Sequence, residues 1–149
     1  MRIIYYTDFH LRSLPPANRV EKNFLEVQLD KQKQVWNYAS KLDVDFLLFG
    51  GDFFDVANPS NQLINQVIGF WKDNSPNIPT FSLVGNHDET GKRMDSYEKN
   101  GLGIFEKTGY FHIIKDKLSF PEVEIFAFHY LPENDLNDMN YNRLNLMVK

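Results

Sequence analysis

The sequence predicts an α/β protein with a largely parallel sheet, in which short strands alternate with amphipathic helices. Three observations lead to this fold class. Apolar and aromatic runs of about five residues alternate with stretches of helical periodicity. The 149-residue chain is 42% hydrophobic and 15% aromatic, which suits one packed domain over residues 1–149. Strands separated by helices imply right-handed crossovers and therefore parallel neighbours.

The first third of the chain contains two expected strands and one long helix. Residues 2–6 form a β-branched and aromatic run that is typical of a buried strand. Residues 21–42 carry apolar side chains at helical spacings, as in an amphipathic helix. A fully apolar strand is expected at 46–49, and Gly50 and Gly51 end it.

The rest of the chain continues the alternation. Pro59 and Ser60 open a helix with one apolar face, and Ser60 is suited to cap its first turn. The remaining expected elements are a strand at 80–84, a shorter helix at 96–107, and strands at 110–114 and 123–128. The asparagine-rich end after residue 134 is expected to form a loop followed by a short helix or a frayed end.

Composition excludes several classes of protein. A net charge of −4 argues against a free-standing nucleic-acid binder, which is normally basic. With no cysteine, the chain has no disulfide framework, thiolate metal site or cysteine nucleophile. No run approaches the ~18 apolar residues of a membrane span, and the first residues do not resemble a signal peptide. We therefore expect a cytoplasmic protein without membrane association.

Polar side chains follow each of the first three expected strands. In an open α/β sheet, the loops at the carboxyl ends of parallel strands gather on one side and form the site. We therefore expect one rim to contain the following residues: Asp8, His10, Asp52, Asn86, His87 and Asp88.

These residue types indicate a particular chemistry. Clustered carboxylates and imidazoles repel and desolvate one another unless cations compensate them. Oxygen and imidazole donors without sulfur suit Mn, Mg, Fe or Zn. A carboxylate between two ions can bridge them, and such a pair promotes in-line phosphoryl displacement. A neighbouring histidine is placed to protonate a leaving oxygen.

Simpler explanations exist for each motif taken alone. An Asp-x-His after a strand is often a cap or a turn, and Gly-Asp is common turn chemistry. Gly-Asn-His-Asp is more specific, because no turn type requires it. Turn chemistry explains poorly why all three occur in this order at three strand ends.

The three motifs resemble those of the calcineurin-like metallophosphoesterase superfamily. The surrounding sequence, TDFHL at 7–11, GDFFD at 51–55 and GNHDETG at 85–91, resembles more closely the nuclease subunit of SbcCD-type DNA-break repair complexes, including phage versions. Residues 128–133 resemble the strand and turn that follow in those nucleases. The resemblance covers nearly the whole chain.

The resemblance implies a fold and an activity. The fold would be the amino-terminal part of a four-layer α/β/β/α sandwich. The activity would be exonuclease or endonuclease cleavage of DNA phosphodiesters with two divalent ions, manganese first and Mg, Fe or Zn as alternatives. The partners would be DNA and an SbcC-like ATPase subunit, in the cytoplasm of a bacterium or a phage-infected cell, in DNA repair or recombination.

The resemblance also assigns roles to single residues. Asp8 and His10 would be ligands of the first metal, and Asp52 would be the bridging carboxylate. Asn86 would be a ligand of the second metal. The catalytic pair would be His87, as general acid, and Asp88, as its orienting partner. Asp55 is auxiliary, because an Asp just before a helix is equally often a structural cap.

Two motifs of the family have no counterpart here, a His after a later strand and a Gly-His-x-His motif. After Asp88 the sequence holds only His112 and His129. We expect His112 to be packed or at a solvent-exposed edge, whereas His129 ends a strand and could join the site. The domain is therefore interpreted as partial, with impaired activity on its own.

A partial sandwich would leave an apolar sheet face uncovered, and such faces usually mark an interface. The chain is thus expected to dimerise, to pair with a second polypeptide that supplies the missing half, or to be a fragment. An alternative function is a catalytically incomplete binding or regulatory module for a nuclease or its ATPase partner. A phosphatase or nucleotide phosphodiesterase is a weaker alternative.

Overall fold

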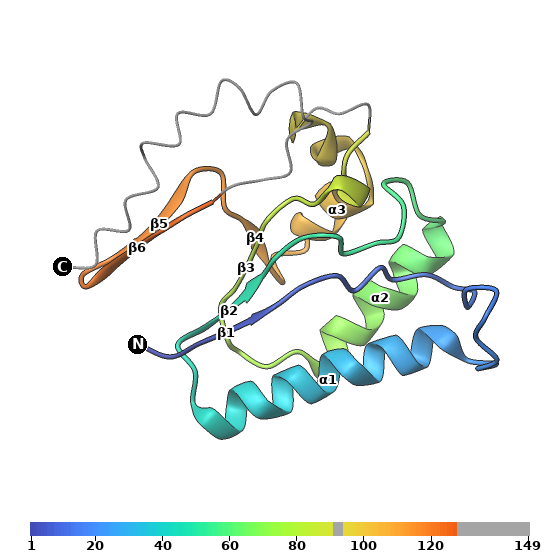
Figure 1. Ribbon diagram of the computed structural model, residues 1–149, viewed down its shortest axis with the longest axis horizontal. Coiled ribbons are helices and arrows are strands. Elements are labelled where there is room, and N and C mark those ends of the chain that lie inside the picture. Colours follow the sequence, from blue (N-terminus) through green and yellow to red (C-terminus); the bar gives the residue numbers. More distant parts are fainter. Residues whose placement is uncertain (91–93, 128–149) are drawn as a thin grey trace.

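The computed structural model describes residues 1–90 and 94–127 (Figure 1). It is an α/β structure, as predicted. The elements are, in chain order, β1 (Ile3–Tyr6), α1 (Phe24–Leu42), β2 (Phe46–Phe49), α2 (Asn61–Asn74), β3 (Thr80–Ser82), the 3₁₀ turns η1 (Asn86–Asp88) and η2 (Met94–Lys99), α3 (Gly101–Glu106), β4 (His112–Ile113), β5 (Lys117–Phe120) and β6 (Val123–Phe126).

The main sheet has four parallel strands in the order β1-β2-β3-β4. Its parallel arrangement confirms the prediction from strand–helix alternation. β6 does not join this sheet but pairs antiparallel with β5, a strand that the sequence analysis did not predict. The KLSF sequence of β5 is short and only half apolar, so its pairing with β6 becomes recognisable only in the folded chain.

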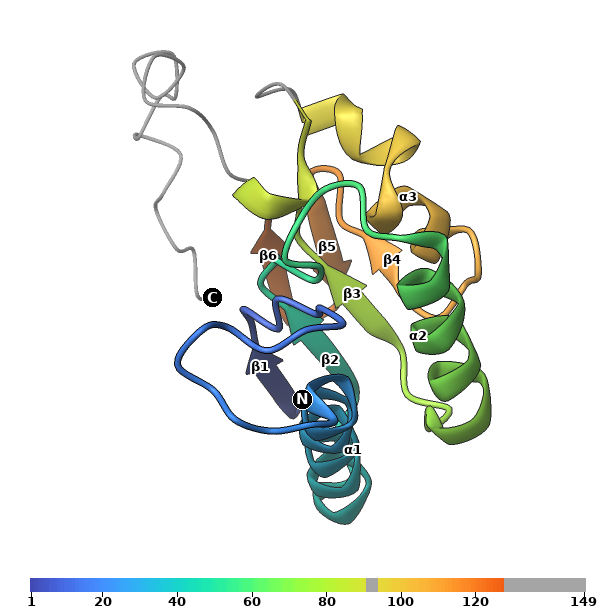
Figure 2. The same cartoon turned by 90° about the vertical axis from the view of Figure 1, so that its right-hand side faces the viewer.

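The described elements form three layers, with α1 and α2 on one face of the main sheet and the β5–β6 hairpin on the other (Figures 1 and 2). The ring of Phe120 in the hairpin stacks on Phe46 of β2 at a centroid distance of 5.0 Å. On the same face Tyr5 of β1 is 60% exposed, so the described residues cover its apolar surface only in part. Whether the sheet face is an interface stays a prediction.

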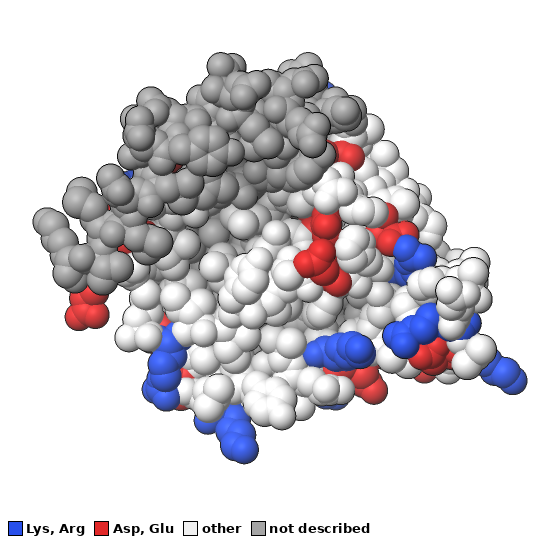
Figure 3. All heavy atoms as spheres, in the orientation of Figure 1, with Lys and Arg blue, Asp and Glu red and all other residues white. Residues whose placement is uncertain are grey.

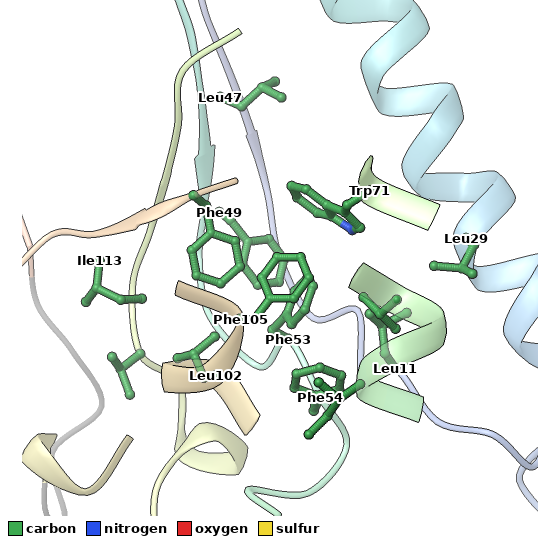
Figure 4. Packing of buried hydrophobic residues seen from close by; sticks show 14 of the residues in the cluster. Leu11, Leu29, Leu47, Phe49, Phe53, Phe54, Trp71, Leu102, Phe105 and Ile113 are labelled. Carbon is green, nitrogen blue, oxygen red and sulfur yellow. The ribbon is translucent and has the colours of Figure 1, made fainter. Parts of the chain in front are cut away.

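The hydrophobic core lies between the main sheet and the helices (Figure 4). Its centre is aromatic: Phe53 lies 4.7 Å from Phe105 and 5.4 Å from Phe111 between ring centroids. Phe53 directly follows Asp52, and Leu11 directly follows His10, and both are 1% exposed. The loops that carry the polar rim are thus anchored to the core by the residues that follow the rim.

The predicted helix at 96–107 is wrong in one respect, because it divides into η2 and α3. Asn100 interrupts it, since its side-chain oxygen accepts a hydrogen bond from the Leu102 N–H and caps α3. Asn100 is 2% exposed, and its amide donates to the Asp88 carbonyl. The division therefore links α3 to the rim.

Two other expectations concern histidines. His112 lies exposed on the edge strand β4, as predicted. His129 and the asparagine-rich end lie outside the described residues. Within residues 1–90 and 94–127, none of the helices combines the length and the apolar character needed to cross a membrane.

Ser60 caps α2 as the sequence predicted, its hydroxyl accepting a hydrogen bond of 3.2 Å from the Leu63 N–H. Replacing Ser60 with Ala should lower the free energy of unfolding by about 1 kcal/mol, because the N–H loses its acceptor. Ser60→Asp keeps an acceptor at the same place and should stay close to wild type. Urea unfolding of both variants measures the difference, and equal losses in both would contradict a capping role.

Candidate metal centre

The rim begins where the β1 and β2 chains continue side by side beyond their strands. The Asp8 N–H donates to the Gly51 carbonyl at 3.2 Å, and the His10 N–H donates to the Asp52 carbonyl at 2.9 Å. These hydrogen bonds hold the two loops side by side, so that their side chains lie at the same edge of the sheet. They explain why the first two strand ends converge, as predicted.

Three rim residues adopt the left-handed backbone region that non-glycine residues rarely occupy. The φ angles are 59° for Asp8, 45° for His10 and 59° for Asp52. Such conformations cost of order 1–3 kcal/mol each, persist only where the surroundings enforce them, and cluster at functional sites. Here the hydrogen bonds between the two loops enforce them.

The end of β3 reaches the rim through a close contact between Gly85 and Gly51. Gly51 has a φ of 104°, and a Cβ there would lie 2.7 Å from the Gly85 nitrogen. A Cβ on Gly85 would in turn collide with the Asp52 carboxylate. The two glycines therefore allow β2 and β3 to bring Asp52 and the η1 turn into contact.

His10, Asp52 and His87 form the centre of the site. Each offers one ligand atom, and these atoms lie within 4.8 Å of one another. The His10 Nε2 lies 3.6 Å from an Asp8 oxygen and 3.8 Å from an Asp52 oxygen. Asn86 is exposed at the start of the η1 turn that carries His87.

Asp55 contacts both histidines. The His87 Nδ1 lies 2.6 Å from the Asp55 carbonyl oxygen, which can only accept, so this nitrogen carries the proton and Nε2 is left for the site. The Asp55 carboxylate pairs with Arg12 and lies 3.6 Å from the His10 Nδ1. The sequence analysis treated Asp55 as auxiliary or as a cap, but Ser60 caps the helix that follows.

Asp88 is almost completely buried, and its carboxylate accepts hydrogen bonds from the backbone. It accepts hydrogen bonds from the N–H groups of Asp52 at 2.8 Å, Gly85 at 2.9 Å and Phe53 at 3.1 Å. Burial raises the pKa of this carboxyl to about 6, although these hydrogen bonds act in the opposite direction.

The resemblance implies that Asp88 orients the His87 ring, and the structure gives both groups other partners. The carboxylate is occupied by backbone donors, and the ring is held by the Asp55 carbonyl. Asp88 instead fastens the β2 end to the β3 end. It acts on the site through Asp52, whose own carboxylate accepts a 2.9 Å hydrogen bond from the His87 N–H.

Gln28 of α1 is a positioning residue that sequence reasoning missed. Its amide donates to the carbonyls of Phe9 and His10 at 2.9 Å each, and its oxygen accepts from the Arg12 N–H at 3.2 Å. The only signal in the sequence is a glutamine close to the apolar stripe of an amphipathic helix, which does not by itself indicate a partner.

The donor set fits hard or borderline divalent cations. Carboxylate oxygens and imidazole nitrogens converge without sulfur, which suits Mn, Fe, Zn or Mg. The carboxylates of Asp8, Asp52 and Asp55 lie around His10. Arg12 forms an ion pair with one of them, Asp55. A bound cation would relieve the repulsion between these carboxylates.

The sequence matches the calcineurin-like phosphoesterase family over residues 1–147. The chain belongs to this family. Its predicted membership is thereby confirmed, and the family explains why carboxylates and histidines gather at three strand ends. Divalent metals are the cofactors that this phosphoesterase family implies.

Three relatives share one printed name, DNA double-strand break repair protein Mre11. The protein of Archaeoglobus fulgidus is 30% identical over 79 residues, 52% of this chain. The protein of Thermoplasma acidophilum is 30% identical over 109 residues, 71% of the chain. The protein of Sulfolobus acidocaldarius is 23% identical over 140 residues, 93% of the chain.

The matched segments cover only part of these relatives. They amount to 18% of the Archaeoglobus protein, 27% of the Thermoplasma protein and 36% of the Sulfolobus protein. The phosphoesterase described here therefore spans about a third or less of each relative. A phage origin stays a prediction.

Replacing Asp88 with Ala should destabilise the phosphoesterase by about 3 kcal/mol or more, because three N–H groups lose a buried acceptor. Asp88→Asn keeps one carbonyl oxygen and should lose less. Urea unfolding measures both variants. Wild-type stability of the Ala variant would contradict the bridging role.

Replacing Gln28 with Ala should lower the free energy of unfolding by about 1–2 kcal/mol and weaken Mn²⁺ binding, because the loop that carries His10 loses its attachment to α1. Gln34→Ala, at an exposed position of the same helix, is the matched control. Urea unfolding and calorimetric metal titration check the two effects. Identical behaviour of the two variants would rule out positioning by Gln28.

Proposed function

We propose that this phosphoesterase hydrolyses DNA phosphodiesters in a metal-dependent reaction, as a nuclease subunit for DNA repair or recombination. The observation that carries the proposal is the convergence of ligand atoms from His10, Asp52 and His87 at the ends of three parallel strands. DNA as the substrate is supported by the printed name of the three relatives.

The ligand roles in this proposal are those that the sequence resemblance implies. Asp8 and His10 would hold a first divalent ion, Asn86 would hold a second, and Asp52 would be the carboxylate shared by both. Manganese is the ion we propose. When bound, such ions act as Lewis acids on a phosphate and generate a nucleophile from water at neutral pH.

His87 is proposed to protonate the leaving oxygen. Its Nδ1 proton is committed to the Asp55 carbonyl, so Nε2 is the nitrogen that can hold and transfer a proton at the site. Asp88 supports this geometry indirectly by fixing Asp52 and the turn that carries His87.

The proposed setting is the one that the sequence resemblance implies. Activity of a whole repair nuclease would require further polypeptide, supplied by a second copy, another chain or a longer form of this one. DNA and an SbcC-like ATPase subunit are the proposed partners, in the cytoplasm. The half-exposed ring of Tyr5 leaves apolar surface on the sheet for such an association.

Asp52→Asn should reduce Mn²⁺-dependent cleavage of a labelled oligonucleotide at least about 100-fold, because it removes a charge that a bridging ligand must supply. Asp30→Asn, an exposed position on α1, makes the same chemical change away from the rim and should remain active. The assay uses millimolar Mn²⁺ so that weak metal binding does not hide activity. Absence of cleavage by a folded, metal-loaded wild-type chain would refute autonomous hydrolysis.

The role of His87 can be separated from that of a metal ligand by the leaving group. His87→Ala should reduce cleavage of the oligonucleotide, which has a poor leaving group, about 100-fold or more. Hydrolysis of bis(p-nitrophenyl) phosphate, whose leaving group needs no proton, should fall much less. An equal loss on both substrates, together with weaker Mn²⁺ binding, would identify His87 as a ligand instead.

A further inference from the structure

The His10 imidazole has carboxylates at both of its nitrogens. Its Nε2 lies 3.6 Å from an Asp8 oxygen and 3.8 Å from an Asp52 oxygen, and its Nδ1 lies 3.6 Å from an Asp55 oxygen. Imidazole and carboxylate donors for a divalent cation are therefore present on both edges of the ring. Because these distances are nearly equal, another feature must determine on which edge a cation binds.

Arg12 makes the two edges unequal in charge. Its Nη2 pairs with the Asp55 Oδ1, the same oxygen that faces the His10 Nδ1. Among residues 1–90 and 94–127, no lysine or arginine forms an ion pair with Asp8 or Asp52. Figure 3 shows acidic side chains, with basic ones close to several of them, on the face that this view presents. The Nδ1 edge thus already has a fixed cation, whereas the Nε2 edge keeps two uncompensated carboxylates.

The backbone fixes the place of this ion pair. The Leu11 N–H donates to the Phe53 carbonyl at 2.9 Å, and the Leu11 carbonyl accepts from the Asp55 N–H at 3.2 Å. The Arg12 N–H donates to the Gln28 side-chain oxygen at 3.2 Å. The side chains of Arg12 and Asp55 are only 33% and 21% exposed, so solvent and salt screen their attraction less than that of an open surface pair.

A second arginine close to the metal centre is paired elsewhere. A hollow of about 490 Å³ beside the centre is lined by His10, Arg12 and Arg19, among others. The Arg19 guanidinium lies 3.4 Å from a Glu21 oxygen and 5.6 Å from the centroid of the Phe24 ring. Arg19 therefore provides a matched comparison for Arg12, with the same charge beside the same hollow but another carboxylate as its partner.

We propose that Arg12 is a positioning residue, which determines on which edge of His10 a divalent cation binds. By pairing with Asp55, Arg12 holds this carboxylate out of the coordination sphere, and the ion binds at Nε2 together with Asp8 and Asp52. The Nδ1 proton is then directed toward Asp55, and an outer carboxylate of this kind orients a ligand histidine. The inference rests on the metal centre of the proposed function and adds the residue that places the ion.

The choice of edge matters for the proposed reaction. Ligand atoms of His10, Asp52 and His87 lie within 4.8 Å of one another, and Asp52 faces the Nε2 edge of His10. An ion on the Nδ1 edge would be held by Asp55 and would lose Asp52, the carboxylate proposed to be shared by both ions. Arg12 thereby keeps the ion at the place where the proposed general acid, His87, also converges.

The test is NMR of the imidazole nitrogens in the full chain, labelled with ¹⁵N and titrated with Zn²⁺, which is diamagnetic and suits the same donors. In the wild type, Zn²⁺ should shift the His10 Nε2 signal, and Nδ1 should keep its proton. Arg12→Gln should raise the affinity of the Nδ1 edge for Zn²⁺ about tenfold or more, because it removes a repelling charge and frees Asp55. His10 should then bind Zn²⁺ through Nδ1 as well.

Three control variants separate positioning from other effects. Arg12→Lys keeps the charge and should retain binding through Nε2. Arg19→Gln makes the same change beside the same hollow and should behave as the wild type. The double variant Arg12→Gln, Asp55→Asn removes the freed carboxylate and should restore binding through Nε2, a rescue that a merely structural role of Arg12 would not produce.

Several outcomes would overturn the proposal. Wild-type coordination of Zn²⁺ in Arg12→Gln would show that Arg12 does not determine the edge, as would Nδ1 binding or no binding in the wild type. Equal changes in Arg12→Gln and Arg19→Gln would indicate a general charge effect. Failure of Asp55→Asn to restore Nε2 binding would show that Arg12 does not act through Asp55.

The placement of the ion and the hydrolysis can fail separately. Cleavage of the oligonucleotide in Mn²⁺ with unchanged His10 coordination in Arg12→Gln would overturn the role of Arg12 and leave hydrolysis intact. An Arg12-dependent choice of edge without any cleavage by the wild type would uphold that role and refute hydrolysis. Circular dichroism and thermal unfolding in EDTA confirm that the variants are folded, and Arg12→Met is a second variant that removes the charge.

Discussion

The site depends on one buried carboxylate. Asp88 accepts hydrogen bonds from backbone N–H groups at the end of β2 and at the end of β3, and thereby holds two strand ends at a fixed spacing. Because Asp52 and His87 follow these two ends, their relative position is set by Asp88.

A second constraint holds the β1 end to the β2 end. The hydrogen bonds from Asp8 and His10 to the β2 loop force both residues into the left-handed region, and the buried Leu11 and Phe53 keep the loops from relaxing. Such strain is tolerated only where the surroundings over-determine it. The rim is therefore a rigid arrangement before any cation binds, which lowers the entropic cost of binding one.

Charges of both signs meet beside the metal centre. Carboxylates lie around His10, and Arg12 pairs with Asp55, which is one of them. Arg19 and Lys31 line the same hollow as Asp8 and His10. The overall charge of −4 describes neither of these local environments.

The sequence by itself determined the alternation of strands and helices, the parallel sheet, the cap at Ser60 and the gathering of six polar residues at one edge, because each follows from local periodicity or from strand-end chemistry. Only the tertiary structure decided the partners of those residues. Asp88 binds backbone rather than the His87 ring, Asp55 and Gln28 hold the histidines, and β5 pairs with β6. The physical reason is that hydrogen-bond partners distant in sequence are selected by burial and packing, and a linear pattern of residue types does not contain them.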